Sequence, residues 1–403
     1  MIVATLRQRT PRALFTGAVF DQISHSVGLI FTPLYLGALG AGPALVGLVI
    51  GVTTFANPLI ILSAGSLIER VSPRRLIVMT RVMVAAALLL AVVAQTWWQL
   101  APALALISAG SLAYPAVSRA IAETTSPAGR ARAFFLVYGV GSNLALILAP
   151  AMGGFVAEGF GLRWVYLVAL LLELAAIACF LGIESSVGRH AQTVRQTYRD
   201  VVRCRPVLAI SLFLFAAMLI LTAGLALLPT FLYDYRGLSV GTIGRLGSLS
   251  GVGGLALALG LARIRRRVSV VSPLIVTLAL IPGAFALLAF SPHLAIIAIA
   301  CFISGAYLMV WPLVDAAVGN LAPERLRGRS FALSEVFGGS GIALGPMLAG
   351  VLYAQGPQLP LLFALAGTLL ALLPVTLVLR RYLERAQAAI EQEDDAALRE
   401  ATP

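Results

Sequence analysis

The sequence contains no lysine, so all 29 of its basic residues are arginine. A phosphate-binding loop of the G-x-x-x-x-G-K-[ST] type needs a lysine, and this chain therefore cannot hold one. Because arginine keeps its proton in proteins, we expect aspartate, glutamate and the three histidines to carry any transferred protons. The sequence excludes transport energised by ATP bound to this chain and leaves proton coupling open.

Charge of either sign is scarce. Charged residues make up 11% of the chain and hydrophobic residues 60%, with a mean hydropathy of +0.95. A water-soluble domain of this length would not tolerate such a surface. The net charge of +12 falls in short clusters between apolar segments, which is typical of topology signals. We therefore expect an integral protein of the lipid bilayer with no nucleic-acid partner.

Cysteine is also rare. Cys179 and Cys301 lie in apolar segments and Cys204 in a basic loop, which indicates neither a disulfide framework nor a metal site. The sequence contains no pattern typical of a catalytic triad, so we expect no enzyme, no metal and no cofactor. The first apolar segment is too long for a signal peptide and lacks a small-residue cleavage site, so we expect a retained span.

Twelve apolar segments are long enough to cross about 30 Å of hydrocarbon, which predicts an all-α membrane protein. The approximate spans are 13–36, 45–67, 76–95, 100–121, 133–157, 163–183, 208–232, 242–262, 272–290, 294–318, 331–353 and 359–380. Arginines cluster near the N-terminus and in every second connection, whereas the others hold little more than Arg163, Arg236 and Arg245. This asymmetry predicts cytoplasmic termini in a cell inner (plasma) membrane.

The chain repeats itself. At an offset of 197, Tyr114-Pro115 matches Trp311-Pro312, and at 196 Pro150 matches Pro346. Gly40 and Gly47 likewise match Gly237 and Gly244. An ordered series at one spacing predicts two homologous six-helix bundles. The expected divisions are bundle 1–183, cytoplasmic linker 184–206, bundle 207–381 and cytoplasmic tail 382–403.

This organisation resembles the major facilitator superfamily over nearly the whole chain. Residues 65–75 are similar to that family's G-x-x-x-D-R-x-G-R-R loop, although Glu69 replaces the aspartate and Ser72-Pro73 replaces Gly-Arg. The resemblance implies a cytoplasmic latch, although a cluster that merely fixes topology would look the same. The residues it assigns to this gate are Gly65, Glu69, Arg70, Arg74 and Glu123.

Residues 149–154 resemble the G-P-x-x-G-G motif of the twelve-helix drug:proton antiporter branch, with Ala149 in place of the first glycine. The spaced glycines and proline can form a flexing helix contact, and packing alone would also explain them. The gating residues assigned on this basis are Pro150, Gly154, Gly345 and Pro346. Residues 103–107 lack the arginine that those antiporters usually carry in the fourth helix.

Asp21 and His25 lie one turn apart in the first span, so they share a helix face. An ionisable residue at the centre of a membrane helix costs roughly 2.5–3.5 kcal/mol, so a transport role is the favoured interpretation. The resemblance implies that helices 1, 4, 7 and 10 line a central cavity, with Asp21 about 12 Å deep at 1.5 Å per residue. The alternative is a buried hydrogen bond to Ser24 or to a neighbouring helix.

Other charges also lie within the apolar spans. We expect Arg119 to bridge Asp315 or Glu335 and close the cytoplasmic side, with both carboxylates able to take part in proton coupling, unless all three side chains simply reach the cytoplasm. Arg81 and Glu173 lie in helices 3 and 6, which the resemblance places outside the cavity, where the two can pair with each other. The residues expected to line the substrate cavity, or else to pack the core, are Tyr114, Tyr138, Asn143, Tyr307, Trp311 and Asn57.

These features predict a monomeric secondary active transporter that works by alternating access, with a small-molecule substrate and protons as its partners. The preferred hypothesis is proton-coupled efflux of small amphipathic molecules or drugs, with Asp21 as the proton site and His25 tuning it. One alternative is proton-coupled uptake of a sugar or organic acid, or lipid transport. An alternative of another class is a substrate sensor that does not transport.

Overall fold

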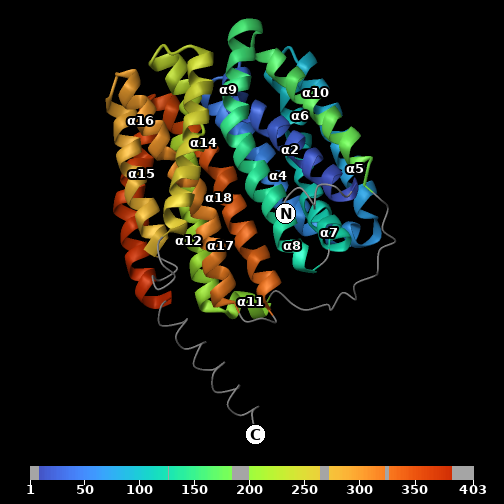
Figure 1. Ribbon diagram of the computed structural model, residues 1–403. Coiled ribbons are helices and arrows are strands. Elements are labelled where there is room, and N and C mark those ends of the chain that lie inside the picture. The colour runs from blue at the N-terminus through green and yellow to red at the C-terminus, as the bar shows by residue number, and fades with distance from the viewer. Residues whose placement is uncertain (1–8, 126, 184–198, 264–271, 323–325, 384–403) are drawn as a thin grey trace. The chain divides into compact units, whose positions relative to one another are not determined.

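The computed structural model describes residues 9–125, 127–183, 199–263, 272–322 and 326–383. Side chains at residues 9, 58–70, 127–128, 131–132 and 199–200 lie outside the described part. Within these ranges the regular structure is entirely helical, with no strand (Figure 1). The expected all-α fold class is confirmed. The expected linker and the tail lie largely outside the described residues.

Each span is built from one helix or from short helices in sequence. In the first part of the chain they are α2 (Arg9–Leu29), α3 (Thr32–Ala38), α4 (Pro43–Arg70), α5 (Pro73–Val93), α6 (Trp97–Ala109), η1 (Gly110–Leu112), α7 (Ala113–Thr124), α8 (Pro127–Phe134), η2 (Phe135–Gly141), α9 (Ser142–Phe160) and α10 (Leu162–Phe180).

The second part follows the same order. Its elements are α11 (Arg199–Arg203), α12 (Arg205–Leu225), α13 (Leu228–Thr230), η3 (Phe231–Tyr235), α14 (Val240–Ala262), α15 (Ser272–Phe290), α16 (Leu294–Ser304), η4 (Gly305–Met309), α17 (Val310–Leu321), α18 (Arg327–Gln355), α19 (Leu359–Gly367) and η6 (Thr368–Leu372).

Ten helices in the described part are long and apolar enough to cross a membrane, and the bent pair of α2 and α3 raises this to eleven. The two helices of the pair meet at 46°. In α4 the apolar stretch Pro43–Asn57 is shorter than a span, and side chains beyond it are not described. A multi-pass membrane protein is therefore confirmed, while the count of twelve spans stays a prediction.

The sequence repeat reappears as helix breaks at equivalent positions. The helix α2 ends at Leu29 and α12 ends at Leu225, and each is followed by a short helix with a proline in its first turn, Pro33 or Pro229. A 3₁₀ turn interrupts the fourth span at Gly110–Leu112 and its counterpart at Gly305–Met309. Because a 3₁₀ turn within a helix often marks a hinge, the repeat preserves bending points as well as residues.

Gly40 and Gly237 are the clearest case of a residue type dictated by the backbone. Their φ angles are +92° and +66°, a left-handed conformation in which a Cβ is strained. Both glycines end the short segment that follows a helix break, and they are matched in the sequence repeat. The equivalent turns therefore need glycine for the same reason.

The chain divides into two compact units. Unit 1 contains Met1–Thr193, Ala226–Gly251 and Gly350–Pro357, and unit 2 contains Val194–Leu225, Val252–Ala349 and Gln358–Pro403. In unit 1, α2 and α5 both pack on α10, and α9 packs on α2. In unit 2, α15 packs on α16 and α19, and α12 packs on α17 and α19. The bundle limits proposed from sequence stay a prediction.

The motif at residues 149–154 is a close-packing surface inside unit 1. A Cβ on Gly153 would lie 2.8 Å from the Val27 carbonyl oxygen, and one on Gly154 would lie 2.9 Å from the Gly244 Cα atom of α14. The Ala151 amide donates to Ser248 Oγ at 2.9 Å. These contacts account for the glycines by the close approach of helix backbones.

We predict that Gly154→Ala destabilises the protein by about 1–3 kcal/mol, because the new methyl group would overlap the α14 backbone. Gly159 is the matched control, since it lies in the same helix and a Cβ there would meet nothing within 4 Å. Alanine favours helix over glycine by roughly 1 kcal/mol, so Gly159→Ala should be neutral or stabilising. Thermal unfolding of the purified variants in detergent measures both, and equal stability of the two would contradict the packing argument.

Candidate functional site

Three charged side chains meet inside unit 1. They are Asp21 from α2, Arg81 from α5 and Glu173 from α10, which are 6%, 4% and 1% exposed. The helices bring them together because α10 packs along both α2 and α5. We call these three residues the ion cluster.

Arg81 is the centre of the ion cluster. Its Nη1 donates to Asp21 Oδ1 and its Nη2 donates to the Gly110 carbonyl oxygen. The same Nη1 lies 3.6 Å from Glu173 Oε1, close enough for an ion pair but too long for a hydrogen bond. Arg81 therefore bonds Asp21 and the α6–α7 break directly, and acts on Glu173 mainly through its charge.

The carbonyl bonded by Arg81 belongs to the 3₁₀ turn η1. A Cβ on Gly110 would lie 2.7 Å from Val84 Cγ2 and 3.5 Å from Arg81 Nη2. Only a residue without a side chain lets α5 approach this closely. The break in the fourth span is thus bonded to the ion cluster through the Gly110 carbonyl oxygen.

Arg81 and Glu173 were assigned to outer helices in the sequence analysis, with each other as partners. The pairing is confirmed in part, since an ion pair joins them. Arg81 also bonds Asp21, and this partnership was not predicted from the sequence. The sequence signal that could have brought the three residues together is their depth along their helices. Counted from the helix ends at Arg9, Pro73 and Phe180, the three residues lie roughly 18, 12 and 11 Å along their helices at 1.5 Å per residue.

Ser24 adds a second interhelical bond beside the ion cluster. Its hydroxyl donates to the Ala169 carbonyl oxygen of α10 at 2.8 Å. Of the two alternatives for Asp21, the bond to a neighbouring helix is therefore the one that forms, and it goes to Arg81. Asp21 thus bonds Arg81 of α5, and Ser24 bonds α10.

His25 is exposed, whereas Asp21 is buried. In the part of the chain that is described, no hydrogen bond or ion pair joins the two side chains. The charges of Asp21 and Arg81 nevertheless act on both His25 and Tyr114. His25 and Tyr114 therefore lie within the electric field of the ion cluster without being bonded into it.

Several residues assigned to the substrate cavity form polar contacts with one another. Tyr138 and Ser118 share a hydrogen bond of 2.9 Å, and the Tyr138 hydroxyl also donates to the Tyr114 carbonyl oxygen at 3.1 Å. Ser111 donates to Asn57 Oδ1 at 2.5 Å. Asn143 donates to a carbonyl in its own helical segment, that of Gly139, at 2.7 Å. The structure thus brings Tyr114 and Tyr138 together and pairs Asn57 with the η1 turn.

Arg119 and Glu123, near the end of α7, form a local pair. Arg119 Nε donates to Glu123 Oε1 at 2.7 Å, one turn further along α7. The bridge from Arg119 to Asp315 or Glu335 stays a prediction. Gly65, Glu69 and Arg70 end α4, but their side chains lie outside the described residues, so the latch proposed there also stays a prediction.

Unit 2 holds its own candidates. A Cβ on Gly338 of α18 would lie 2.6 Å from the Trp311 indole, so this ring packs on the helix one turn from Glu335. The charge of Asp315 acts on Glu335, which places the two carboxyls in one neighbourhood. Tyr307 lies in η4, directly before the helix that carries Trp311. Gly345 and Pro346 lie further along α18, where Gly345 packs on α12.

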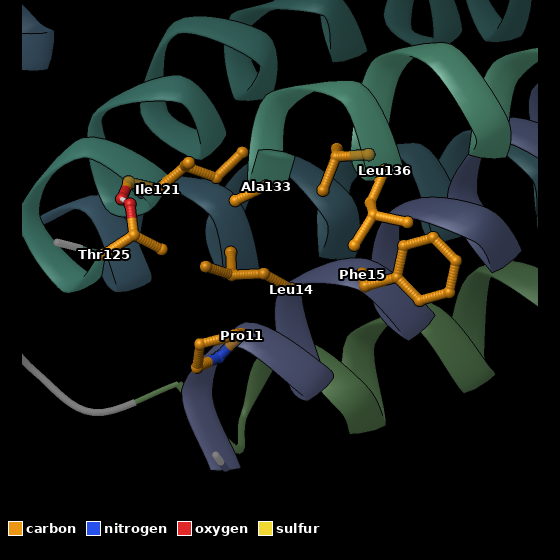
Figure 2. Close-up of a pocket in the computed structure, with 8 residues that line it drawn as sticks. Pro11, Leu14, Phe15, Ile121, Thr125, Ala133 and Leu136 are labelled. Carbon is orange, nitrogen blue, oxygen red and sulfur yellow. Dashed lines mark hydrogen bonds between the residues drawn. The ribbon is translucent and has the colours of Figure 1, made fainter. Parts of the chain in front are cut away.

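A narrow apolar pocket lies at the start of α2 (Figure 2). Its lining includes Leu14 and Phe15 of α2, Ile121 of α7 and Leu136 of η2. Among the described side chains, none that line it is ionisable. Within the described residues, moreover, no group of three or more His, Cys, Asp or Glu side chains is arranged to hold a metal ion.

A family model described as Major Facilitator Superfamily matches residues 14–310 and 263–401. The chain belongs to the Major Facilitator Superfamily. A search of curated proteins found no match. The buried ion cluster therefore lies in a transporter of this superfamily, while the drug:proton antiporter branch stays a proposal.

Solved structures of Major Facilitator Superfamily type share the fold. The peptide transporter POT, in a mutant form, is 17% identical with a TM-score of 0.77, and the match covers 94% of this chain and 95% of that one. A mutant of the nucleoside transporter NupG is 13% identical with a TM-score of 0.74 and coverage of 93% and 99%. The human organic anion transporter MFSD10 is 15% identical with a TM-score of 0.67 and coverage of 91% and 99%.

We predict that Arg81→Met lowers the free energy of unfolding by about 3–5 kcal/mol, because it leaves the Asp21 carboxylate buried without its partner. The double variant Asp21→Asn/Arg81→Met should recover part of this loss. Arg245→Met is the control, since Arg245 is exposed and bonds Thr242 in its own helix. Thermal unfolding in detergent is the measurement, and an Arg81→Met variant as stable as the control would contradict the role of the ion cluster.

Proposed function

We propose that the protein is a proton-coupled secondary transporter that exports small amphipathic molecules by alternating access, with the ion cluster as its coupling site. The observation that carries this proposal is the burial of Asp21, Arg81 and Glu173 among apolar helices. Charged groups within a membrane span are costly and usually mark ion or proton pathways. With no lysine in the chain, the two carboxyls are among its few groups that can exchange a proton inside the membrane.

Export of an amphipathic molecule is supported by two features. The packing of Gly153 and Gly154 gives a structural basis to the motif that resembles drug:proton antiporters. The polar side chains near Tyr114 largely satisfy one another through the Ser118, Tyr138, Asn57 and Ser111 bonds. A substrate held there would rely mainly on aromatic and apolar contacts.

The proposed coupling is competitive. A proton on the ion cluster and a substrate in the cavity each favour a different state, so binding of one drives release of the other. Asp21 is the exchanging carboxyl because it lies on α2, the helix expected to line the cavity, and bonds Arg81 directly. His25 and Tyr114 lie close enough for their charges and dipoles to adjust that exchange.

We predict that Asp21→Asn abolishes pH-driven uptake into everted vesicles but leaves counterflow exchange in proteoliposomes, because asparagine can still hydrogen-bond Arg81 but cannot carry a proton. The probe is the compound with the largest thermal shift in a screen of dyes, antibiotics, sugars and lipids. Asp234→Asn is the matched control, since this carboxylate is exposed at the end of a span.

If pH-driven uptake survives in Asp21→Asn, Asp21 is ruled out as the exchanging group. Binding of the probe without counterflow, in the protein with its native sequence, would favour the sensor over the carrier. A sugar or organic acid as the strongest probe, with uptake into right-side-out vesicles, would favour the alternative of proton-coupled uptake.

A further inference from the structure

Glu173 is the most enclosed carboxyl in the described part of the chain, with 1% of its surface exposed. It lies in the middle of α10, a candidate membrane span of 19 residues. In the proposed coupling scheme Asp21 is the exchanging carboxyl, and Glu173 has no separate role. Its surroundings indicate one.

The positive charge available to Glu173 is limited. The helices packed on α10 are α2, α5 and α9, with a smaller contact from α3. The titratable and charged side chains on these helices and on neighbouring α7 that bear on the site are Asp21, His25, Arg81 and Tyr114. Tyr35 of α3 bonds Ala91, and Glu158 of α9 is exposed near the far end of its helix. Arg81 is therefore the one permanent cation of this set, facing two carboxyls.

The geometry assigns that cation to Asp21. Arg81 Nη1 hydrogen-bonds Asp21 Oδ1, and its Nη2 is held by the Gly110 carbonyl oxygen. Glu173 Oε1 stands 3.6 Å from Nη1 and accepts no hydrogen bond. A buried carboxylate oxygen that accepts no hydrogen bond carries a desolvation cost, which a bound proton lowers.

Ser24 supplies an independent argument. It is a polar neighbour of Glu173, because the Ala169 carbonyl that it bonds lies one turn before Glu173 in α10. The single hydroxyl hydrogen of Ser24 is already donated to Ala169 at 2.8 Å. Toward Glu173, Ser24 can offer only lone pairs. A neutral carboxylic acid can donate a hydrogen bond to these lone pairs, which a carboxylate cannot do.

We propose that Glu173 holds a proton in this arrangement while Arg81 neutralises Asp21, so that the ion cluster contains one cation, one carboxylate and one neutral acid. Glu173 is then the resting site of the coupling proton, and Asp21 is the group through which it exchanges. The coupling role of this proton rests on the proposed function, whereas the protonation of Glu173 does not depend on it.

Infrared spectroscopy of the purified protein at neutral pH, without substrate or gradient, tests the assignment. A protonated carboxylic acid has a carbonyl stretch that is separate from the carboxylate bands and shifts in D₂O. We expect Glu173→Gln to remove intensity from this band, because glutamine replaces the neutral acid. Glu173→Asp should move that intensity to a new position, and Asp21→Glu should leave it where it was.

Asp234→Asn is the control and should change nothing in this band, because Asp234 is an exposed carboxylate. If Asp21→Glu moves the band and Glu173→Asp does not, the proton resides on Asp21 and the proposal is overturned. It is equally overturned if Glu173→Gln leaves the band unchanged. Should one variant fail to fold, the remaining pair still distinguishes the two acids.

The outcome is separable from that of the transport assay. If the band belongs to Glu173 but uptake does not respond to pH, then proton coupling fails and the protonation stands. If uptake responds to pH but the band does not belong to Glu173, then the transporter proposal stands and this inference fails.

Discussion

The structure of unit 1 depends on how three ionisable side chains are kept in a membrane. Breaking a buried ion pair leaves an uncompensated charge that costs several kcal/mol, so Asp21, Arg81 and Glu173 constrain one another's position. They come from three helices, and therefore α2, α5 and α10 must hold one relative register for the charges to meet. The Gly110 carbonyl extends this constraint to the break in the fourth span. Glycine at position 110 follows from this contact, since a side chain there would push α5 away.

The two repeats share their backbone breaks but not this chemistry. Residues equivalent to Asp21, Arg81 and Glu173 by the sequence offsets of 196 and 197 are Ala217, Leu278 and Leu369. Ala217 and Leu278 are fully buried and Leu369 is exposed, so the second repeat has apolar residues at all three positions. Its own charges, Asp315 and Glu335, lie elsewhere in the fold. The repeat therefore conserves hinges such as η1 and η4, whereas charge is specific to each half.

Much of the fold follows from the sequence because the bilayer fixes helix length and the repeat fixes order. The glycines at 40 and 237 were matched by spacing, and their positive φ angles give the reason. The partnership of Arg81 with Asp21 was missed because a helix-by-helix pattern says which helices line a cavity, not which way one side chain on an outer helix points. The depth of each charged residue along its helix restricts its possible partners more strongly, since charges buried together must lie at similar depth. The η1 turn has no such signal, because its glycine is one of 38 in the chain.

The site of the ion cluster, between helices of one unit, bears on how protonation can change conformation. A proton lost from water-exposed groups is compensated by solvent, whereas loss from Glu173 leaves two carboxylates around one guanidinium. Arg81 must then move toward Glu173, or water must enter. Arg81 also donates to the Gly110 carbonyl oxygen, so the side chain that neutralises Asp21 is also the one that bonds η1. The counterpart of η1 in the second repeat has the same break, but the position equivalent to Arg81 there is Leu278, so the bond between an arginine and the break belongs to the first repeat.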